Sequence, residues 1–142
     1  MIDRVIESIV VGTDGSDEGA AAVRFAAERA AACRSLLEVV TCTGGHQVQN
    51  VDMDALRTSA ERIASEAAEQ ARAAHPTLTV TVRVDDCPPE ETLVATSRDA
   101  GMVVVGNRGR GAFEGMLLGS VSHAVIHGAA CSVAVVAPDS PQ

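Results

Sequence analysis

The sequence contains no lysine, no tryptophan and no tyrosine, and it has only two phenylalanines. Because every basic residue is an arginine, Schiff-base chemistry and a P-loop lysine are excluded. The scarcity of aromatic rings argues against a base-stacking surface for single-stranded nucleic acid. The formal net charge of −8 further argues against binding to nucleic acid or to an anionic membrane.

Long apolar runs are also absent. No stretch approaches the ~20 residues that a bilayer-spanning helix requires. The first residues, MIDRVIESIVVGTDGS, are acidic where a secretory signal would have a basic start. The cysteines form no CxxC pair, so neither a zinc site nor a redox motif is indicated. We therefore expect a cytoplasmic protein with reduced thiols.

Apolar runs and helical patterns alternate along the 142 residues, which we expect to form one domain with a frayed tail over 138–142. Runs that are apolar throughout, such as VVVG and VAVV, are typical of a sheet covered on both faces. The pattern predicts an α/β fold with a parallel five-stranded sheet. The predicted strands are Ser8–Asp14, Ser35–Cys42, Leu78–Val84, Met102–Gly106 and Ser132–Ala137; the predicted helices are Asp17–Cys33, Val51–His75, Pro88–Ala100 and Ser120–Ala129.

A glycine-rich segment follows the fourth predicted strand. The dinucleotide fingerprint GxGxxG is incomplete, because Glu114 stands at its third glycine, but the spacing Gly106-x2-Gly109-x9-Gly119-Ser120 is present. Glycines after a strand let the backbone turn tightly and present amide groups, and small residues at a helix start leave N–H groups that attract phosphate. The segment therefore predicts an anion site at the carboxyl ends of the strands, where open α/β sheets bind ligands.

Two arginines, Arg108 and Arg110, add positive charge to this segment, and the hydroxyl of Ser120 can donate a further hydrogen bond. The alternative interpretation is a surface loop followed by an ordinary serine N-cap.

The stretches IVVGTDGS and VVVGNRGRGAFEGMLLGSVSHAVIHGAACSVAVV resemble the universal stress protein family, a group of small Rossmann-like α/β domains of which many bind ATP. The resemblance covers essentially the whole chain and implies the strand order 3-2-1-4-5 with helices on both faces. It implies that Gly106, Gly109, Gly119 and Ser120 wrap the phosphates of ATP, with the amide of Val121 beside them.

The same resemblance places Asp14 near the nucleoside, where its carboxylate can meet the ribose, the adenine or a divalent ion such as Mg²⁺ or Mn²⁺; its alternative role is to cap the first helix. Gly12 stands where some members have proline, and Cys42 falls beside the adenine. Two departures, Thr41 for a frequent histidine and Ser132 for a frequent proline, lie outside the phosphate pattern.

We expect an ATP-binding stress-response sensor or regulator, with ADP or cyclic AMP as other ligands of the same pocket. The alternatives are a slow ATPase, in which Glu114 would act as the base, and a dimeric scaffold. The uncharged segment Val133–Ala137 would be a sheet edge, and such edges invite pairing, so we expect a homodimer through it. His123 and His127 have metal-ligand spacing but lack the glutamate of HExxH, so we predict no metal site there.

Overall fold

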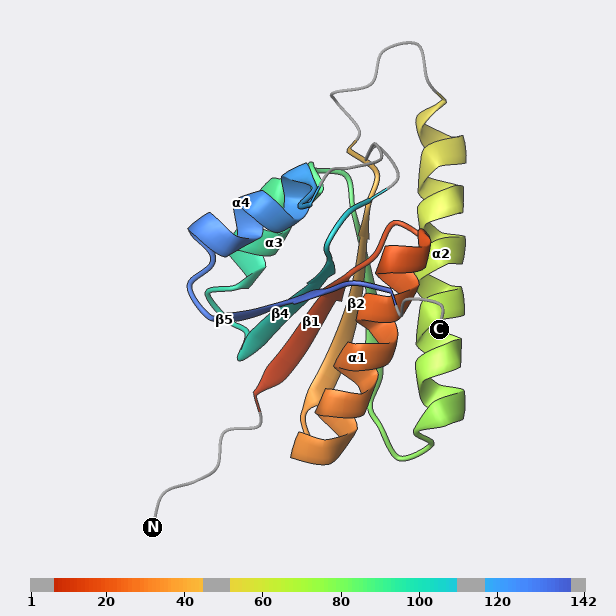
Figure 1. Cartoon of the computed structure of the whole chain (residues 1–142). Coiled ribbons are helices and arrows are strands. Elements are labelled where there is room, and N and C mark those ends of the chain that lie inside the picture. Colours follow the sequence, from red (N-terminus) through yellow and green to blue (C-terminus); the bar gives the residue numbers. More distant parts are fainter. Residues whose placement is uncertain (1–6, 45–51, 110–116, 139–142) are drawn as a thin grey trace.

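The computed structural model describes residues 7–44, 52–109 and 117–138. Strands and helices alternate throughout (Figure 1). The strands form a parallel sheet of order β3-β2-β1-β4-β5, which confirms the predicted fold class and strand order. The elements are β1 Ser8–Gly12, α1 Asp17–Cys33, β2 Leu36–Cys42, α2 Met53–Ala74, β3 Val80–Asp85, α3 Pro89–Thr96, β4 Met102–Gly106, α4 Ser120–Gly128 and β5 Ser132–Val136.

Two helical layers cover the sheet, with α1 and α2 on one face and α3 and α4 on the other (Figure 1). Successive residues of a strand point to opposite faces, so Val11 packs under α1 and α2, whereas Val10 and Val103 pack under α3 and α4. This two-sided burial is why the central strands are apolar at consecutive positions.

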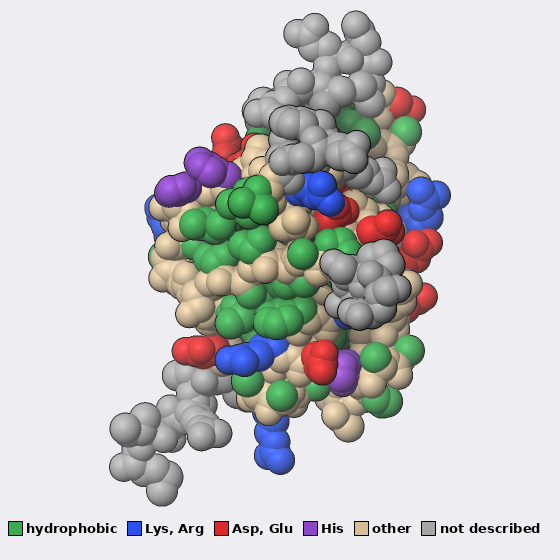
Figure 2. Space-filling model, in the orientation of Figure 1, with side chains coloured by type: hydrophobic (Ala, Val, Ile, Leu, Met, Phe, Trp, Pro, Cys, Tyr) green, Lys and Arg blue, Asp and Glu red, His purple; other side chains and the backbone are tan. Residues whose placement is uncertain are grey.

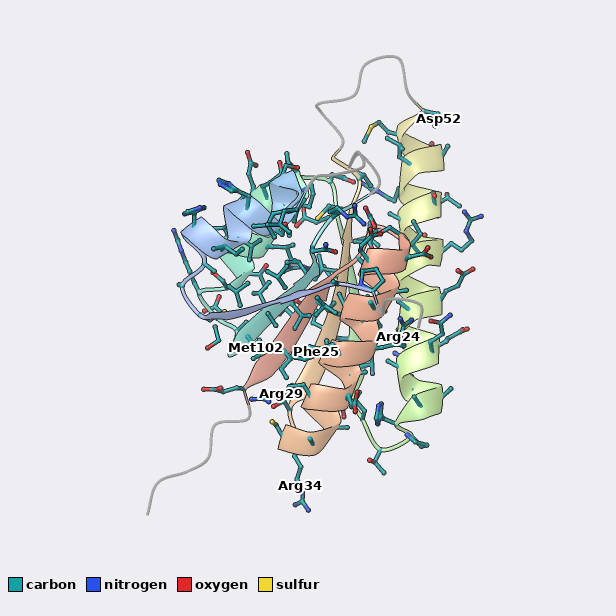
Figure 3. The ribbon with its side chains drawn as sticks, viewed as in Figure 1. Arg24, Phe25, Arg29, Arg34, Asp52 and Met102 are labelled. Carbon is teal, nitrogen blue, oxygen red and sulfur yellow. The ribbon has the colours of Figure 1, made fainter. Side chains whose placement is uncertain are left out.

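Helix termini are set by local hydrogen bonds. Ser16 caps α1, because its hydroxyl accepts a hydrogen bond from the Gly19 N–H at 3.1 Å. Arg34 follows the last residue of α1 (Figure 3). Its backbone is left-handed, with φ 57°, and its N–H donates to carbonyls of the last turn. Asp52 starts α2 by accepting from the N–H groups of Asp54 and Ala55.

Some predicted boundaries differ from the observed ones by two to four residues. β1 ends at Gly12 rather than Asp14, and β3 starts at Val80 rather than Leu78. Helix α3 ends at Thr96 instead of Ala100, because the buried hydroxyl of Ser97 donates to the Val94 carbonyl at 2.6 Å and accepts from the Ala130 N–H at 2.8 Å. The side chain thus takes part in bonds that close this end of the helix.

Among the helices that the structure describes, none has both the length and the apolar character needed to cross a membrane. Arg110, Glu114 and all of the predicted tail except Pro138 lie outside the described residues.

Candidate functional site

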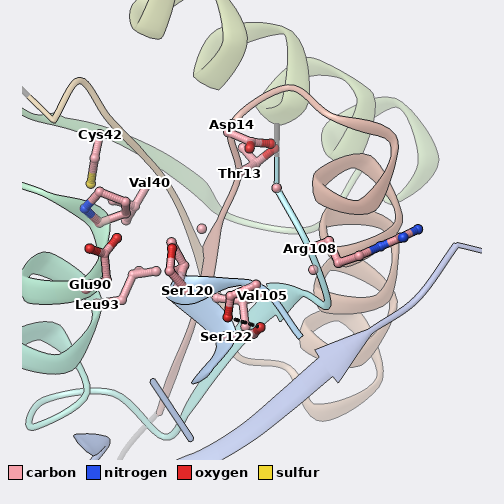
Figure 4. Close-up of a pocket in the computed structure, with 16 residues that line it drawn as sticks. Thr13, Asp14, Val40, Cys42, Glu90, Leu93, Val105, Arg108, Ser120 and Ser122 are labelled. Atoms are coloured by element: carbon pink, nitrogen blue, oxygen red, sulfur yellow. Dashed lines mark hydrogen bonds between the residues drawn. The ribbon is translucent and has the colours of Figure 1, made fainter. Parts of the chain in front are cut away.

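The carboxyl ends of β1, β2 and β4 and the starts of α3 and α4 surround a cavity of about 560 Å³ (Figure 4). A cavity of this size falls within the range of small-molecule sites, about 300–1,000 Å³. The nine residues that the sequence singled out as ligand-binding all lie in its wall, namely Gly12, Asp14, Cys42, Gly106, Arg108, Gly109, Gly119, Ser120 and Val121. The fold thus brings together three stretches that are far apart in the sequence.

The cavity has two chemically different ends. The apolar end is formed by the side chains of Val40, Cys42, Pro89 and Leu93 (Figure 4). The amide end is formed by Gly106, Arg108 and Gly109 after β4 and by Gly119, Ser120 and Val121 at the start of α4. A ligand that fills the cavity would therefore meet hydrophobic side chains on one side and backbone groups on the other.

Helix α4 begins directly after Gly119, which is its N-cap. The Gly119 N–H is not available to a ligand, because it donates to the Asn107 carbonyl at 2.7 Å. The N–H groups of Ser120 and Val121 belong to the first turn, which has no acceptor inside the helix. Together with the helix dipole, these groups can attract an anion.

Ser122 joins the chain after β4 to the start of α4, a role that the sequence analysis missed. Its side chain is buried, and its hydroxyl lies 3.0 Å from the Asn107 carbonyl and 3.1 Å from the Gly119 carbonyl, so one proton is shared between two acceptors. The Asn107 carbonyl therefore links the end of β4 to the start of α4. The only sequence signal for this contact was the presence of a second serine, Ser122, two positions after Ser120.

The glycines of the motif have different neighbours. A Cβ atom at Gly106 would lie 2.8 Å from the main-chain carbon of Glu18, and one at Gly109 would lie 2.7 Å from Oδ2 of Asp14. A Cβ atom at Gly119 would come no closer than 3.3 Å, to Cα of Arg108. Gly106 is thus required because the backbone of α1 packs directly against it, which is a structural reason independent of any ligand.

Asp14 sits at the turn between β1 and α1. Its Oδ1 accepts a hydrogen bond from the Ser16 N–H at 2.9 Å, and Ser16 itself caps α1. The alternative role considered for Asp14, that of helix cap, therefore belongs to Ser16. The carboxylate of Asp14 lines the cavity next to Gly109, where it can accept hydrogen bonds or meet a cation.

The side chain of Arg108 differs from the expectation. Its guanidinium lies 3.1 Å from the Glu18 carboxylate and points away from the cavity, toward α1 (Figure 4). The positive charge of Arg108 is therefore balanced by Glu18. At the amide end, the main-chain N–H groups at the start of α4 and the Ser120 hydroxyl remain as donors for an anion.

The thiol of Cys42 is neutral over the physiological range. Burial raises its pKa to about 11, partly opposed by the nearby Thr92 hydroxyl. A protonated thiol is a poor nucleophile and a poor metal ligand. At the apolar end, Cys42 therefore acts as a small hydrophobic group.

His123 and His127 lie side by side on α4, with ring centroids 4.4 Å apart. Both side chains are exposed. Within residues 7–44, 52–109 and 117–138, no three His, Cys, Asp or Glu side chains gather in a way that could hold a metal ion.

Relatives among solved structures share this architecture. A universal stress protein solved in complex with cAMP is 31% identical, with a TM-score of 0.73 over 96% of this chain and 100% of that one. A universal stress protein of Archaeoglobus fulgidus in complex with dAMP is 26% identical, with a TM-score of 0.72 over 93% of this chain and 99% of that one.

Curated relatives include universal stress proteins of mycobacteria. Universal stress protein Rv2005c of Mycobacterium tuberculosis is 37% identical over 89% of this chain and 44% of the relative. A universal stress protein of Mycolicibacterium smegmatis is 36% identical over 92% of this chain and 48% of the relative. The chain thus spans about half the length of the curated relatives it matches. The model of the universal stress protein family matches residues 6–137, and the chain therefore belongs to the universal stress protein family.

Proposed function

We propose that the cavity binds ATP, with the adenine at the apolar end and the phosphates at the amide end. The observation that carries this proposal is the division of one cavity into hydrophobic side chains and a glycine-framed helix start. A nucleotide has the same division, because its base is largely apolar and its phosphates are anionic. Phosphates are favoured ligands of a helix N-terminus.

In this arrangement the phosphates meet the amides of Ser120 and Val121, while Gly109 and Gly119 keep that space clear. Gly106 and Arg108 contribute through the main chain that borders the amide end. Asp14 faces the ribose or a divalent ion, such as Mg²⁺ or Mn²⁺, that accompanies the phosphates.

Gly12 and Cys42 border the nucleoside. Gly12 packs closely against Leu93 of the apolar end, because a Cβ atom at Gly12 would lie 2.7 Å from Cδ1 of that side chain. The relatives solved with cAMP and dAMP support an adenine nucleotide, and ADP or cyclic AMP would fit the same two ends.

We place the protein in the cytoplasm as a nucleotide-dependent stress sensor or regulator. The slow-ATPase alternative requires a base near the γ-phosphate, for which Asp14 and Glu114 are the candidates. Measured phosphate release that falls in both Asp14→Ala and Glu114→Ala variants, while ATP still binds, would favour the ATPase. A scaffold would instead capture its partners equally with and without nucleotide.

The test of the binding site is Gly119→Glu. A carboxylate at the start of α4 would occupy the amide end and repel phosphate, and the loss of two or three charge-assisted hydrogen bonds, ~1.5–3 kcal/mol each, would weaken ATP binding by several orders of magnitude. Isothermal titration of ATP measures the loss, and circular dichroism verifies the fold. Adenosine, which has no phosphates, should lose much less affinity. Unchanged ATP binding by the folded variant, or no ATP binding by the wild type, would refute the site.

We further propose a homodimer through Val133–Ala137. Within the described residues β5 pairs with β4 alone, so its outer edge is open. Its valines are only partly buried, and hydrophobic side chains gather on the face over β5 (Figure 2). An open apolar edge favours pairing with another strand. Light scattering should show a dimer at micromolar concentration for the wild type and a monomer for Val135→Lys; a wild-type monomer would contradict the proposal.

A further inference from the structure

We propose that Glu90 selects the base of the bound nucleotide. Its carboxylate accepts a hydrogen bond from the 6-amino group of adenine and disfavours purines that carry a 6-keto group. This inference rests on the proposed function, because it assumes that the base occupies the apolar end of the cavity.

Glu90 belongs to the first turn of α3, directly after Pro89, and its half-buried side chain lines the cavity. Figure 4 shows it close to Cys42 and Leu93, on the side of the cavity away from Asp14 and Arg108. A residue in this place would meet the base rather than the phosphates.

The surroundings make this carboxylate exceptional within the apolar end. Val40, Pro89 and Leu93 are hydrocarbon, and the Cys42 thiol is protonated because burial raises its pKa to about 11. Glu90 is therefore the charged side chain among the described residues that line this end. A half-buried carboxylate loses part of its hydration, which favours a hydrogen-bonded partner.

The Glu90 carboxylate has no hydrogen-bond or ion-pair partner among the described residues of the protein. Three other acids do have partners: Glu18 pairs with Arg108, Asp86 pairs with Arg57, and Asp14, which also lines the cavity, accepts from the Ser16 N–H. Glu90 is thus left with acceptor oxygens that a ligand can use.

Ligand chemistry then decides which base fits. A carboxylate is an acceptor only, and the 6-amino group of adenine is a donor. Hypoxanthine has a carbonyl oxygen at the same position, so two acceptors would face each other, and its donor moves to the adjacent ring nitrogen. Sites built to bind a donor reject analogues that lack it, because the buried partner is then left unpaired.

The experiment uses three ligands that share the ribose phosphate: AMP, IMP and purine riboside 5′-monophosphate, which has neither substituent at position 6. Isothermal titration compares the wild type with Glu90→Gln. Glu91→Gln is the matched control, because Glu91 lies in the same turn of α3 but is exposed and outside the cavity wall. Both variants remove one negative charge from the first turn of α3, so both lose a similar favourable interaction with the helix dipole.

The wild type and Glu91→Gln should prefer AMP over IMP by at least about tenfold, which is the scale of one charge-assisted hydrogen bond, with the unsubstituted purine between them. Glu90→Gln should bring the AMP to IMP ratio to within about threefold, because a carboxamide can turn to donate to the keto oxygen. An unchanged ratio in Glu90→Gln, or an equal fall in Glu91→Gln, overturns the role of Glu90 while AMP binding still stands. A wild type that binds neither AMP nor ATP overturns the proposed function and this inference together.

Discussion

The two ends of the cavity are built from different parts of the chain. The apolar end is made of side chains from β2 and α3, whereas the amide end is made of main chain after β4 and at the start of α4. A side chain can be replaced without moving the backbone, so we expect substitutions at the apolar end to adjust which base binds. The amide end depends on the position of its main chain, so bulky substitutions of its glycines should abolish binding or disturb the fold.

The largest effect on stability should appear when alanine replaces Gly106, which packs against α1, and a much smaller one when it replaces Gly119. A Cβ atom at Gly106 meets the backbone of Glu18 at 2.8 Å, whereas one at Gly119 comes no closer than 3.3 Å to Arg108. Gly106→Ala should therefore lower the free energy of unfolding by about 2–3 kcal/mol, within the range of overpacked sites, and Gly119→Ala by less than about 1 kcal/mol. Urea unfolding of both variants checks the difference. Equal stabilities would show that α1 can move away from β4 at little cost.

The second prediction concerns the apolar end and its thiol. Because the pKa of Cys42 is about 11, iodoacetamide should alkylate it at pH 8 at least about tenfold more slowly than the exposed Cys33, and the rate should rise with pH until about pH 11. Bound AMP should slow the alkylation of Cys42 and leave Cys33 unaffected. Peptide mass spectrometry resolves the two sites, and equally fast labelling of both would contradict the raised pKa of the half-buried Cys42.

The same thiol links stability to pH. The folded protein holds the Cys42 proton more tightly than the unfolded chain, whose thiol has a pKa near 9.0. The stabilisation from this group is therefore complete below about pH 9 and is lost as the pH rises toward 11. A Cys42→Ala variant should lack this component of the alkaline loss of stability.

The smallest effect should come from Arg108, where sequence and structure suggest different outcomes. A phosphate-binding guanidinium would make Arg108→Ala costly to ATP affinity. Because the guanidinium pairs with Glu18 and points away from the cavity, we expect ATP affinity to change by less than about threefold. The partly exposed ion pair should contribute no more than about 1 kcal/mol to stability. A loss of ATP affinity above about tenfold would mean that Arg108 leaves Glu18 when the nucleotide binds.

Much of the fold could be predicted from local patterns. Alternating strands and helices, the parallel sheet and its order were correct, because the apolar runs and the family motifs are strong signals at those positions. The errors lay at ends of elements, such as α3, where Ser97 bonds to Ala130 across a gap of 33 residues. Hydrogen bonds between residues so far apart cannot be predicted from local sequence patterns.

For the cavity, the sequence by itself determined where the backbone must be small and where a helix must start, since glycine spacing and a strand-to-helix transition are local properties. Only the tertiary structure decided what each group does in space. It brought α1 against Gly106, paired Arg108 with Glu18, buried Ser122 between two carbonyls, and placed Glu90 beside Cys42 at the apolar end. The reason is physical: burial, ion pairing and the pKa of a thiol depend on neighbours that the sheet brings together from distant parts of the chain.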